Sequence, residues 1–250
     1  MSWACRRRMG ASISIVGLLL LQGCLGGIWP RRGWKEDPIA ENPFPEVRQI
    51  AVAEFRDWSG QGIDGWALAD FFAAELAQVG FFEVLPVMQV KAAAAKAGLD
   101  SKDPTSALLI AKRLQADAVV LGGVTTYDPY IPKRLGLSVV MLTTATDLSP
   151  EGVRLIMELE RTGKAMRVFS PSGAEGIIAY KARIFDASHN EVVEEAKAYA
   201  ARRKGRQGPL GWRAYVEITE EFLRFACNRI VRQMLTERLL MKGATGASGT

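Results

Sequence analysis

Histidine and cysteine are scarce in this 250-residue chain, and their scarcity excludes several kinds of chemistry. The only histidine, His189, lies beside Asn190 in an expected turn, so a catalytic triad has no other histidine to use as its base. A metal site built from several histidines is excluded for the same reason. The sequence also lacks a Cys-x-x-Cys pair and a Walker glycine-rich loop. We therefore expect no metal, no cofactor and no enzymatic activity.

Apolar runs long enough to cross a membrane are absent as well. The longest near the amino terminus extends from about Ile13 to Leu21, whereas a transmembrane helix needs roughly 20 residues. The basic residues Arg6 to Arg8 precede this run, and Leu21-Gln22-Gly23-Cys24 follows it. Basic residues, a short apolar stretch and a small residue before the cut are typical of a bacterial export signal. The sequence therefore predicts a signal peptide over residues 1–23.

The end of this signal resembles the lipobox of bacterial lipoproteins, with leucine at −3 and Gly23 at −1 before Cys24. In that family the signal is cut before the cysteine, which carries acyl chains such as palmitate. Several chains hold a protein firmly on a membrane, because each buried methylene contributes about 0.8 kcal/mol. Leu25 replaces the aspartate that marks inner-membrane retention in enteric bacteria, so the resemblance implies an outer-membrane lipoprotein facing the periplasm. The alternative is an ordinary secretory signal with a chance cysteine.

The net charge limits the kind of partner to expect, and the number of cysteines limits the disulfides. The formal net charge is +5, and the three signal arginines contribute three of these charges, so no nucleic-acid partner is expected. The basic cluster Arg202-Arg203-Lys204 with Arg206 is interpreted as a solvated loop, with contact to an anionic surface as the alternative.

Cys227 has no partner for an internal disulfide once Cys5 leaves with the signal and Cys24 is acylated. We interpret Cys227 as a buried, inert thiol.

The remaining chain divides into a tether over residues 24–46, one domain over residues 47–241 and a disordered tail over residues 242–250. Hydrophobic periodicity and cap residues predict the elements of the domain. In chain order they are a strand at Ile50–Phe55, a helix capped by Asp64, a strand at Phe81–Leu85, a helix from Pro86 to Ala97, a helix after Asp103-Pro104, strands at Ala118–Thr125, Leu135–Thr144 and Val153–Glu160, a hairpin of Ile177–Asp186 with Val192–Ala201, and a helix from Thr219 to about Leu240. A helix is the alternative for residues 153–160.

This order is βαβααβ, then a β-meander, then a C-terminal helix. The helical connections of the first half allow parallel pairing, and the short turns of the second half suit antiparallel pairing. The predicted fold class is therefore α/β, with a mixed parallel and antiparallel sheet and helices packed on it.

Several of these segments together resemble a group of periplasmic lipoproteins. The segments are Ile50–Phe55, Gly80–Leu85, Ala116–Val124 and the strand end Ile184–Ala187 before its turn. The group includes CsgG, the LpoB-type activators of peptidoglycan synthases and, in outline, the amino-terminal domain of TolB. The resemblance covers about half of the mature chain and concerns strand cores and turns. It implies a role in envelope assembly, secretion or cell-wall synthesis, or alternatively a subunit of a CsgG-like homo-oligomeric secretion channel.

A glycine-rich loop offers a different function. Gly60-Gln61-Gly62-Ile63-Asp64-Gly65 has the GxGxxG spacing between a strand and a helix, as a dinucleotide fingerprint requires. Four residues separate the strand from Gly60, however, and Asp64 places a carboxylate where a pyrophosphate would bind. A turn that caps a helix is the preferred interpretation, and a nucleotide-binding enzyme is the alternative.

Aromatic side chains in expected loops are the best candidates for a binding surface. Tryptophan and tyrosine are enriched where protein interfaces are strongest, although core packing also explains most such residues. The candidates are Trp58, Tyr127, Tyr130 and Trp212. The sequence thus predicts a non-enzymatic, lipid-anchored protein that binds a protein partner in the periplasm.

Overall fold

The computed structural model describes residues 39, 41–164, 176–203 and 208–246. They belong to one compact unit, Trp34–Thr250, and the other unit, Met1–Gly33, lies outside the described residues. The predicted signal and its lipidation site, Gly23 and Cys24, are therefore outside the described part of the chain, as are most of the tether and residues 247–250 of the predicted tail. Within the described part, none of the helices combines the length and the apolar character that crossing a membrane requires.

Six strands form one sheet in the described residues, and the sheet is mixed, as predicted. The strands are β1 (Gln49–Val52), β2 (Arg56–Asp57), β3 (Glu83–Val84), β4 (Ala118–Asp128), β5 (Arg134–Thr143) and β6 (Ile177–Asp186). Their order is β3-β1-β4-β5-β6, and β2 pairs with β4 further along. The pairs β1–β3, β1–β4 and β2–β4 are parallel, whereas β4–β5 and β5–β6 are antiparallel. The predicted change from parallel to antiparallel pairing is confirmed, and it occurs at β4.

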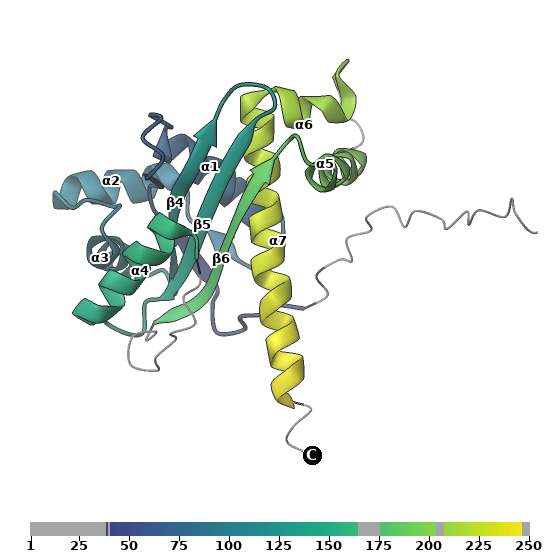
Figure 1. The fold of residues 1–250 in the computed structure, drawn as a ribbon. Helices are drawn as coiled ribbons and strands as arrows, with labels where there is room; N and C mark the ends of the chain where they lie inside the picture. Colours follow the sequence, from purple (N-terminus) through teal and green to yellow (C-terminus); the bar gives the residue numbers. More distant parts are fainter. Residues whose placement is uncertain (1–38, 40, 165–175, 204–207, 247–250) are drawn as a thin grey trace, which may run out of the picture. The chain divides into compact units, whose positions relative to one another are not determined.

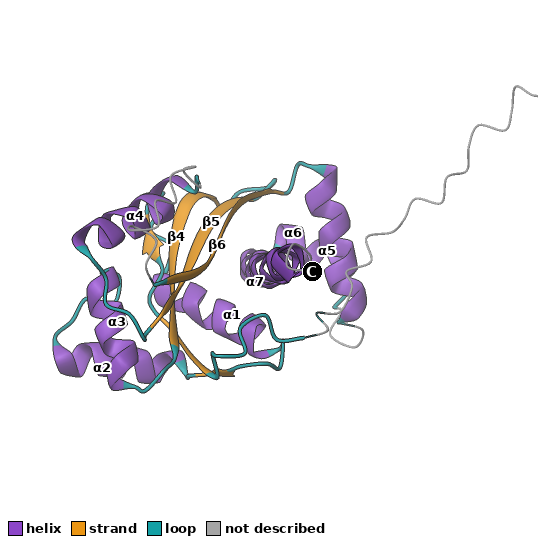
Figure 2. Ribbon diagram, turned by 90° about the horizontal axis from the view of Figure 1, so that it is seen from below, coloured by secondary structure: helices purple, strands orange, loops and turns teal. Residues whose placement is uncertain are grey.

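Helices cover both faces of this sheet (Figures 1 and 2). One face carries α2 (Val87–Ala97), α3 (Pro104–Arg113) and α4 (Pro150–Thr162). The other carries α1 (Gly65–Ala77) and the long α7 (Thr219–Gly246), with α5 (Asn190–Arg202) and α6 (Ala214–Glu217) beyond β6. A 3₁₀ turn at Gly211–Arg213 leads into α6. The result is a three-layer α/β domain.

The two helical layers give the sheet two hydrophobic cores. Along β4, Ala118, Val120 and Val124 pack with α1 and α7, whereas Val119 and Leu121 pack with α2, α3 and α4. This alternation follows from the period of two along a strand. It explains why the first seven residues of β4, Ala118–Val124, are apolar without interruption, as expected for a strand buried on both faces.

Local signals in the first half of the domain fix the helix ends as predicted. The carboxylate of Asp64 accepts hydrogen bonds from the backbone amides of Trp66 and Ala67, and that of Asp103 accepts one from Ser106. Gly98 ends α2 in the left-handed conformation that glycine adopts without steric cost. Pro86, expected as the first residue of α2, is instead the residue that precedes it.

Two predicted strands are helices, so those predictions were wrong. Residues 153–160 belong to α4, which begins after the N-cap Ser149 and ends at Gly163 in the left-handed conformation. Its buried residues Gly152, Ile156 and Leu159 recur at helical spacing, and only the alternative prediction anticipated this. Residues 192–201 belong to α5, in which Val192, Ala196 and Tyr199 are buried at the same spacing. The predicted hairpin is therefore a strand followed by a helix.

A candidate partner-binding surface at one end of the domain

Tyr127 and Tyr130, two of the four predicted aromatic residues, lie at the turn between β4 and β5. Tyr127 is half-buried and hydrogen-bonds with Thr219 at the start of α7; burial raises the pKa of Tyr127. Tyr130 is 79% exposed, and the next residue, Ile131, is 69% exposed. The turn thus presents an aromatic and an aliphatic side chain to solvent, while Tyr127 anchors it.

The other two predicted residues do not belong to this turn. Trp212 is half-buried between α5 and α6, with the Lys197 ammonium 4.9 Å from its ring centroid. Trp58 follows β2 and lies against Gly123 of β4, where a Cβ atom would come within 2.9 Å of the tryptophan ring. The Arg56 guanidinium lies 5.1 Å from the Trp58 ring centroid. Trp58 is therefore separated from the β4–β5 turn, and it packs on β4 beside the end of α4.

The β4–β5 turn is fixed to the start of α7 by a buried lysine. The Lys133 ammonium donates to the Thr219 hydroxyl at 2.9 Å and also to the Pro129 carbonyl. Ile218, the residue before Thr219, is 44% exposed. Figure 1 shows the turn and the start of α7 at the same end of the domain. The contact with Thr219 places the exposed side chains of the turn beside this end of α7.

A shallow cavity of about 220 Å³ extends this end of the domain. Ile218, Leu210 and the backbone of Gly211 are among its lining residues. Of the seven large apolar side chains that are exposed in the described residues, four belong to this end: Tyr130, Ile131, Leu210 and Ile218. We call these four residues the apical surface. Exposed apolar side chains that gather in one region mark interaction sites more often than scattered ones do.

Sequence reasoning found only Tyr130 of this surface. The apolar members Ile131, Leu210 and Ile218 stand alone in loops, where periodicity assigns them no role. Proline is next to two of them, at Pro132 and Pro209, and this was the available signal. A rigid turn can hold a neighbouring apolar side chain out of the core.

Backbone amides of the glycine-rich loop already donate hydrogen bonds to a side chain of the protein itself. The Asp57 carboxylate accepts hydrogen bonds from the backbone amides of Ser59, Gly60, Gly62 and Ile63 at 2.8–3.3 Å. Burial acts to raise the pKa of Asp57, but the hydrogen bonds from the Ser59 hydroxyl and from the amides of Gly62, Ser59 and Ile63 lower it below the ordinary value. The amides that a nucleotide phosphate would need are thus bound to a carboxylate. The loop serves as the turn before α1, as the preferred interpretation stated.

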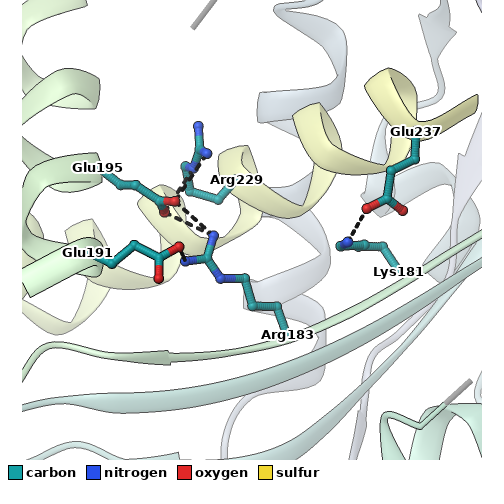
Figure 3. Close-up of polar contacts among 6 residues, drawn as sticks. All are labelled: Lys181, Arg183, Glu191, Glu195, Arg229 and Glu237. Carbon is teal, nitrogen blue, oxygen red and sulfur yellow. Dashed lines mark hydrogen bonds and ion pairs between the residues drawn. The ribbon is translucent and has the colours of Figure 1, made fainter. Parts of the chain in front are cut away.

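Charged residues tie the outer helices to strand β6 (Figure 3). Arg183 of β6 donates through Nη1 to both oxygens of Glu195 at 3.0 Å, and Arg229 of α7 donates to the same carboxylate at 3.1 and 3.3 Å. Glu191 contacts Arg183 from the solvent side at 3.2 Å. Further along the strand, Lys181 pairs with Glu237. Burial raises the pKa of Glu195, and the hydrogen bonds and charge of Arg183 oppose that rise.

Other reactive groups are few in the described residues. No cluster of three histidine, cysteine, aspartate or glutamate side chains in this part of the chain could hold a metal ion. Cys227 is fully buried on α7, and burial raises the pKa of its thiol well above the ordinary value. Its placement agrees with the inert role expected from the sequence.

Comparison with known proteins gives likenesses among solved structures. No family model and no curated protein matches the chain. The C-terminal domain of LpoB from Salmonella enterica is 17% identical with a TM-score of 0.33, and the match covers 40% of this chain and 74% of that one. Lipoprotein GNA1162 from Neisseria meningitidis is 13% identical with a TM-score of 0.40, and the match covers 64% of this chain and 99% of that one. The PelC dodecamer from Paraburkholderia phytofirmans is 12% identical with a TM-score of 0.35, and the match covers 77% of this chain and 87% of that one.

The likeness to LpoB noted in the sequence thus recurs in the structure. These similarities concern the fold alone.

Proposed function

We propose that this protein is a non-enzymatic lipoprotein of the outer membrane, anchored through Cys24, whose domain binds a protein partner in the periplasm through the apical surface. The observation that carries the proposal is the gathering of Tyr130, Ile131, Leu210 and Ile218 at one end of the domain. Aromatic and aliphatic anchors next to a shallow cavity are typical of protein interfaces. The envelope process that the partner serves is secretion, assembly or cell-wall synthesis.

The position of the tether supports a partner away from the membrane. Phe44, near the end of the predicted tether, is buried, and the Arg238 guanidinium of α7 lies 5.6 Å from its ring centroid. Ile218 precedes the opposite end of that helix. The stretch of α7 between them rises by about 30 Å at 1.5 Å per residue. The apical surface is therefore far from the point where the tether joins, and it can face the periplasm.

Photo-crosslinking in the intact envelope tests the apical surface. With a photoreactive residue at position 131, we expect a crosslink to one distinct envelope protein. Position 88 is the matched control, because Met88 is similarly exposed, at 65%, but lies on α2. Equal crosslinking from both positions, or none from position 131, would contradict the proposed surface.

Substitution at the same surface should weaken the complex. Replacing Ile131 and Ile218 with glutamate puts charge where apolar contact is needed, and each interface anchor contributes about 2 kcal/mol, or roughly 30-fold in affinity. We expect at least a tenfold loss of co-purified partner with an unchanged unfolding midpoint. Met88→Glu should leave recovery at the wild-type level. Undiminished recovery from the double variant would rule out the apical surface as the interface.

Cell fractionation tests the anchor. Cys24→Ser removes the acylated thiol, so the protein should leave the membrane fraction. Cys227→Ala is the control, because this thiol is buried in the domain, and that variant should remain in the membrane fraction. A Cys24→Ser protein that stays membrane-bound would show that lipidation does not hold it there.

Assembly into an oligomeric channel is the second candidate, and one observation favours it. Strand β6, ten residues long, is the last strand in the order of the sheet, and no described strand pairs with its outer edge. An unpaired edge can add a strand from another copy. Light scattering of the full-length protein in detergent measures its oligomeric state and so distinguishes the channel from the accessory role. A monomer without conductance in bilayers would eliminate the channel, and a uniform ring would favour it over the accessory role.

A further inference from the structure

Four carboxylate groups lie next to the residues of the apical surface. They come from the end of β4, the end of α6 and the first turn of α7, and their residues are Asp128, Glu217, Glu220 and Glu221. Asp128 accepts a hydrogen bond from the Tyr130 amide at 3.0 Å, so it belongs to the same turn as two of the apolar anchors. Glu217 immediately precedes Ile218 in the chain. Within the described part of the chain, none of the four carboxylates forms an ion pair.

Few cations balance these carboxylates among the described residues of the β4–β5 turn, α6 and the start of α7. Arg134 pairs with Asp186, whose carboxylate lies 3.4 Å from Arg134 Nε, so the charge of that arginine is already matched. The buried Lys133 beneath the turn and the exposed Arg213 before α6 are the two that remain. Two cations thus stand against four carboxylates at this end of the domain, although the formal net charge of the whole chain is +5.

The start of α7 accounts for part of this negative charge. The amino-terminal end of a helix carries about half a positive charge, which makes acidic residues favourable in the first turn. Glu220 and Glu221 occupy that turn. Adding this half charge to the two cations still leaves about one and a half negative charges in excess. The helix end therefore explains why acidic residues stand here, but it does not neutralise them.

One of these carboxylates belongs to the shallow cavity of about 220 Å³. Glu221 is half-buried and lines the cavity with the apolar side chains of Leu210 and Ile218. The cavity is smaller than the sites that take drug-sized ligands, so its size suits a single side chain of a partner. A cation placed there would be partly shielded from water, which strengthens its attraction to Glu221.

We propose that the partner docks on the apical surface through a basic segment, in which lysine or arginine side chains are flanked by apolar ones, and that one of these cations enters the cavity beside Glu221. The apolar side chains of the segment pack on Tyr130 and Ile131, and its other cations lie near the carboxylates of the rim. Complementary charge across an interface speeds association and fixes the orientation of the partner. This inference rests on the proposed function and adds to it the chemistry of the partner.

Fluorescence anisotropy on the full-length protein in non-ionic detergent tests the basic segment. The probe is a labelled peptide in which arginine alternates with leucine, and the reference is the same peptide with glutamine in place of every arginine. We expect saturable binding of the arginine peptide that is about tenfold tighter than that of the glutamine peptide, because only the first neutralises the carboxylates. Raising the salt concentration from about 0.05 M to about 0.5 M should remove most of this difference.

Two substitutions place the binding on the apical surface. The Glu217→Gln/Glu221→Gln double variant should bind the arginine peptide about tenfold more weakly than the wild type. Glu151→Gln is the matched control, because Glu151 is an exposed acidic residue in the first turn of another helix, α4, and it should bind as the wild type does. Equal thermal unfolding midpoints show that the variants are folded. Absence of saturable binding, equal affinity for the two peptides, or undiminished binding by the folded double variant would overturn the inference.

Photo-crosslinking from position 131 separates this inference from the proposed function. In the intact envelope, the crosslink to the partner should weaken when Glu217→Gln and Glu221→Gln are added. A crosslink of unchanged strength would overturn the basic segment and leave the apical surface as the interface. Absence of any crosslink in the protein with both glutamates would contradict the proposed surface, and the inference would be rejected with it.

Discussion

Replacing Glu195 with alanine is expected to lower the free energy of unfolding by about 3–5 kcal/mol, because the substitution takes the shared carboxylate from two buried or nearly buried guanidinium groups. The Arg229 side chain is 3% exposed and the Arg183 side chain 16% exposed. Desolvation makes the loss of an opposite charge costly at such depth. Urea unfolding followed by circular dichroism measures the loss, and an unfolding free energy within 1 kcal/mol of the wild type would contradict this role.

Glu191 provides the matched control on the same helix. It also contacts Arg183, but its side chain is 69% exposed, and exposed ion pairs contribute about 0–1 kcal/mol. Glu191→Ala should therefore cost far less than Glu195→Ala. A double variant, Glu195→Leu with Arg229→Met, removes charge from both sides and should recover part of the loss, since apolar residues replace a buried ion pair well. Equal losses in Glu191→Ala and Glu195→Ala would show that burial does not set the cost.

This network explains one of the two wrong predictions. The segment Val192–Ala201 begins with two valines and was interpreted as the second strand of a hairpin. In the structure it is a helix that buries Glu195 against Arg183 and Arg229, which are 12 and 34 residues away in the sequence. A local pattern cannot reveal that a glutamate is buried by distant arginines. Tertiary contact therefore decided between two local structures that the sequence left close in energy.

The other wrong prediction has a similar cause. Apolar residues alternate over residues 153–159, yet the same segment also satisfies a helical period through Gly152, Ile156 and Leu159. Gly123 of β4 settles the choice, because a Cβ atom there would come within 2.6 Å of the Glu160 carbonyl oxygen. A glycine inside a strand signals the close approach of another backbone, but not which one. The caps at Asp64 and Asp103 were predictable because they depend on contacts within three residues.

The apical surface was only partly predictable for the same physical reason. Tyr130 was predictable because tyrosine in an expected loop is a residue type that protein interfaces favour. The exposure of Ile218 and Leu210 depends on how α6 and the segment before it pack, which no local pattern encodes. The hydrogen bonds that Glu75 of α1 accepts from Tyr199 and Arg203 were beyond sequence reasoning altogether, because they join residues more than 120 positions apart.

The close packing of α4 on β4 buries Glu160, whose side chain is 1% exposed. The nearest cation is Arg56 of β2, whose Nε lies 3.9 Å from Glu160 Oε2, and neither atom has a hydrogen-bond partner among the described residues. Burial raises the pKa of Glu160 to about 8; the charge of Arg56 opposes this rise, and that of Asp103 at the start of α3 adds to it. The folded protein therefore holds a proton on Glu160 at pH values where an unfolded chain has lost it.

This proton makes stability depend on pH in a definite direction. The ordinary pKa of glutamate is 4.5, so between pH 4.5 and about 8 the folded state binds one proton more than the unfolded state. The contribution of Glu160 is then complete below pH 4.5 and decreases as the pH rises, by about 1.4 kcal/mol per unit. Between pH 5 and 8 we expect the stability of the wild type to fall, relative to Glu160→Gln, on the order of 3 kcal/mol.

The comparison with Glu160→Gln isolates this group, because glutamine keeps the shape of the protonated side chain and cannot ionise. Urea unfolding of both proteins from pH 5 to pH 8 gives the difference directly, free of the titration of other residues. Glu158→Gln, on the same helix, is the control, since the Glu158 side chain is 38% exposed and pairs with Arg161 at the surface. Its difference from the wild type should stay constant over this range. If the Glu160→Gln difference were equally constant, Glu160 would be ionised in the folded protein, and Arg56 would then stabilise that charge more than burial penalises it.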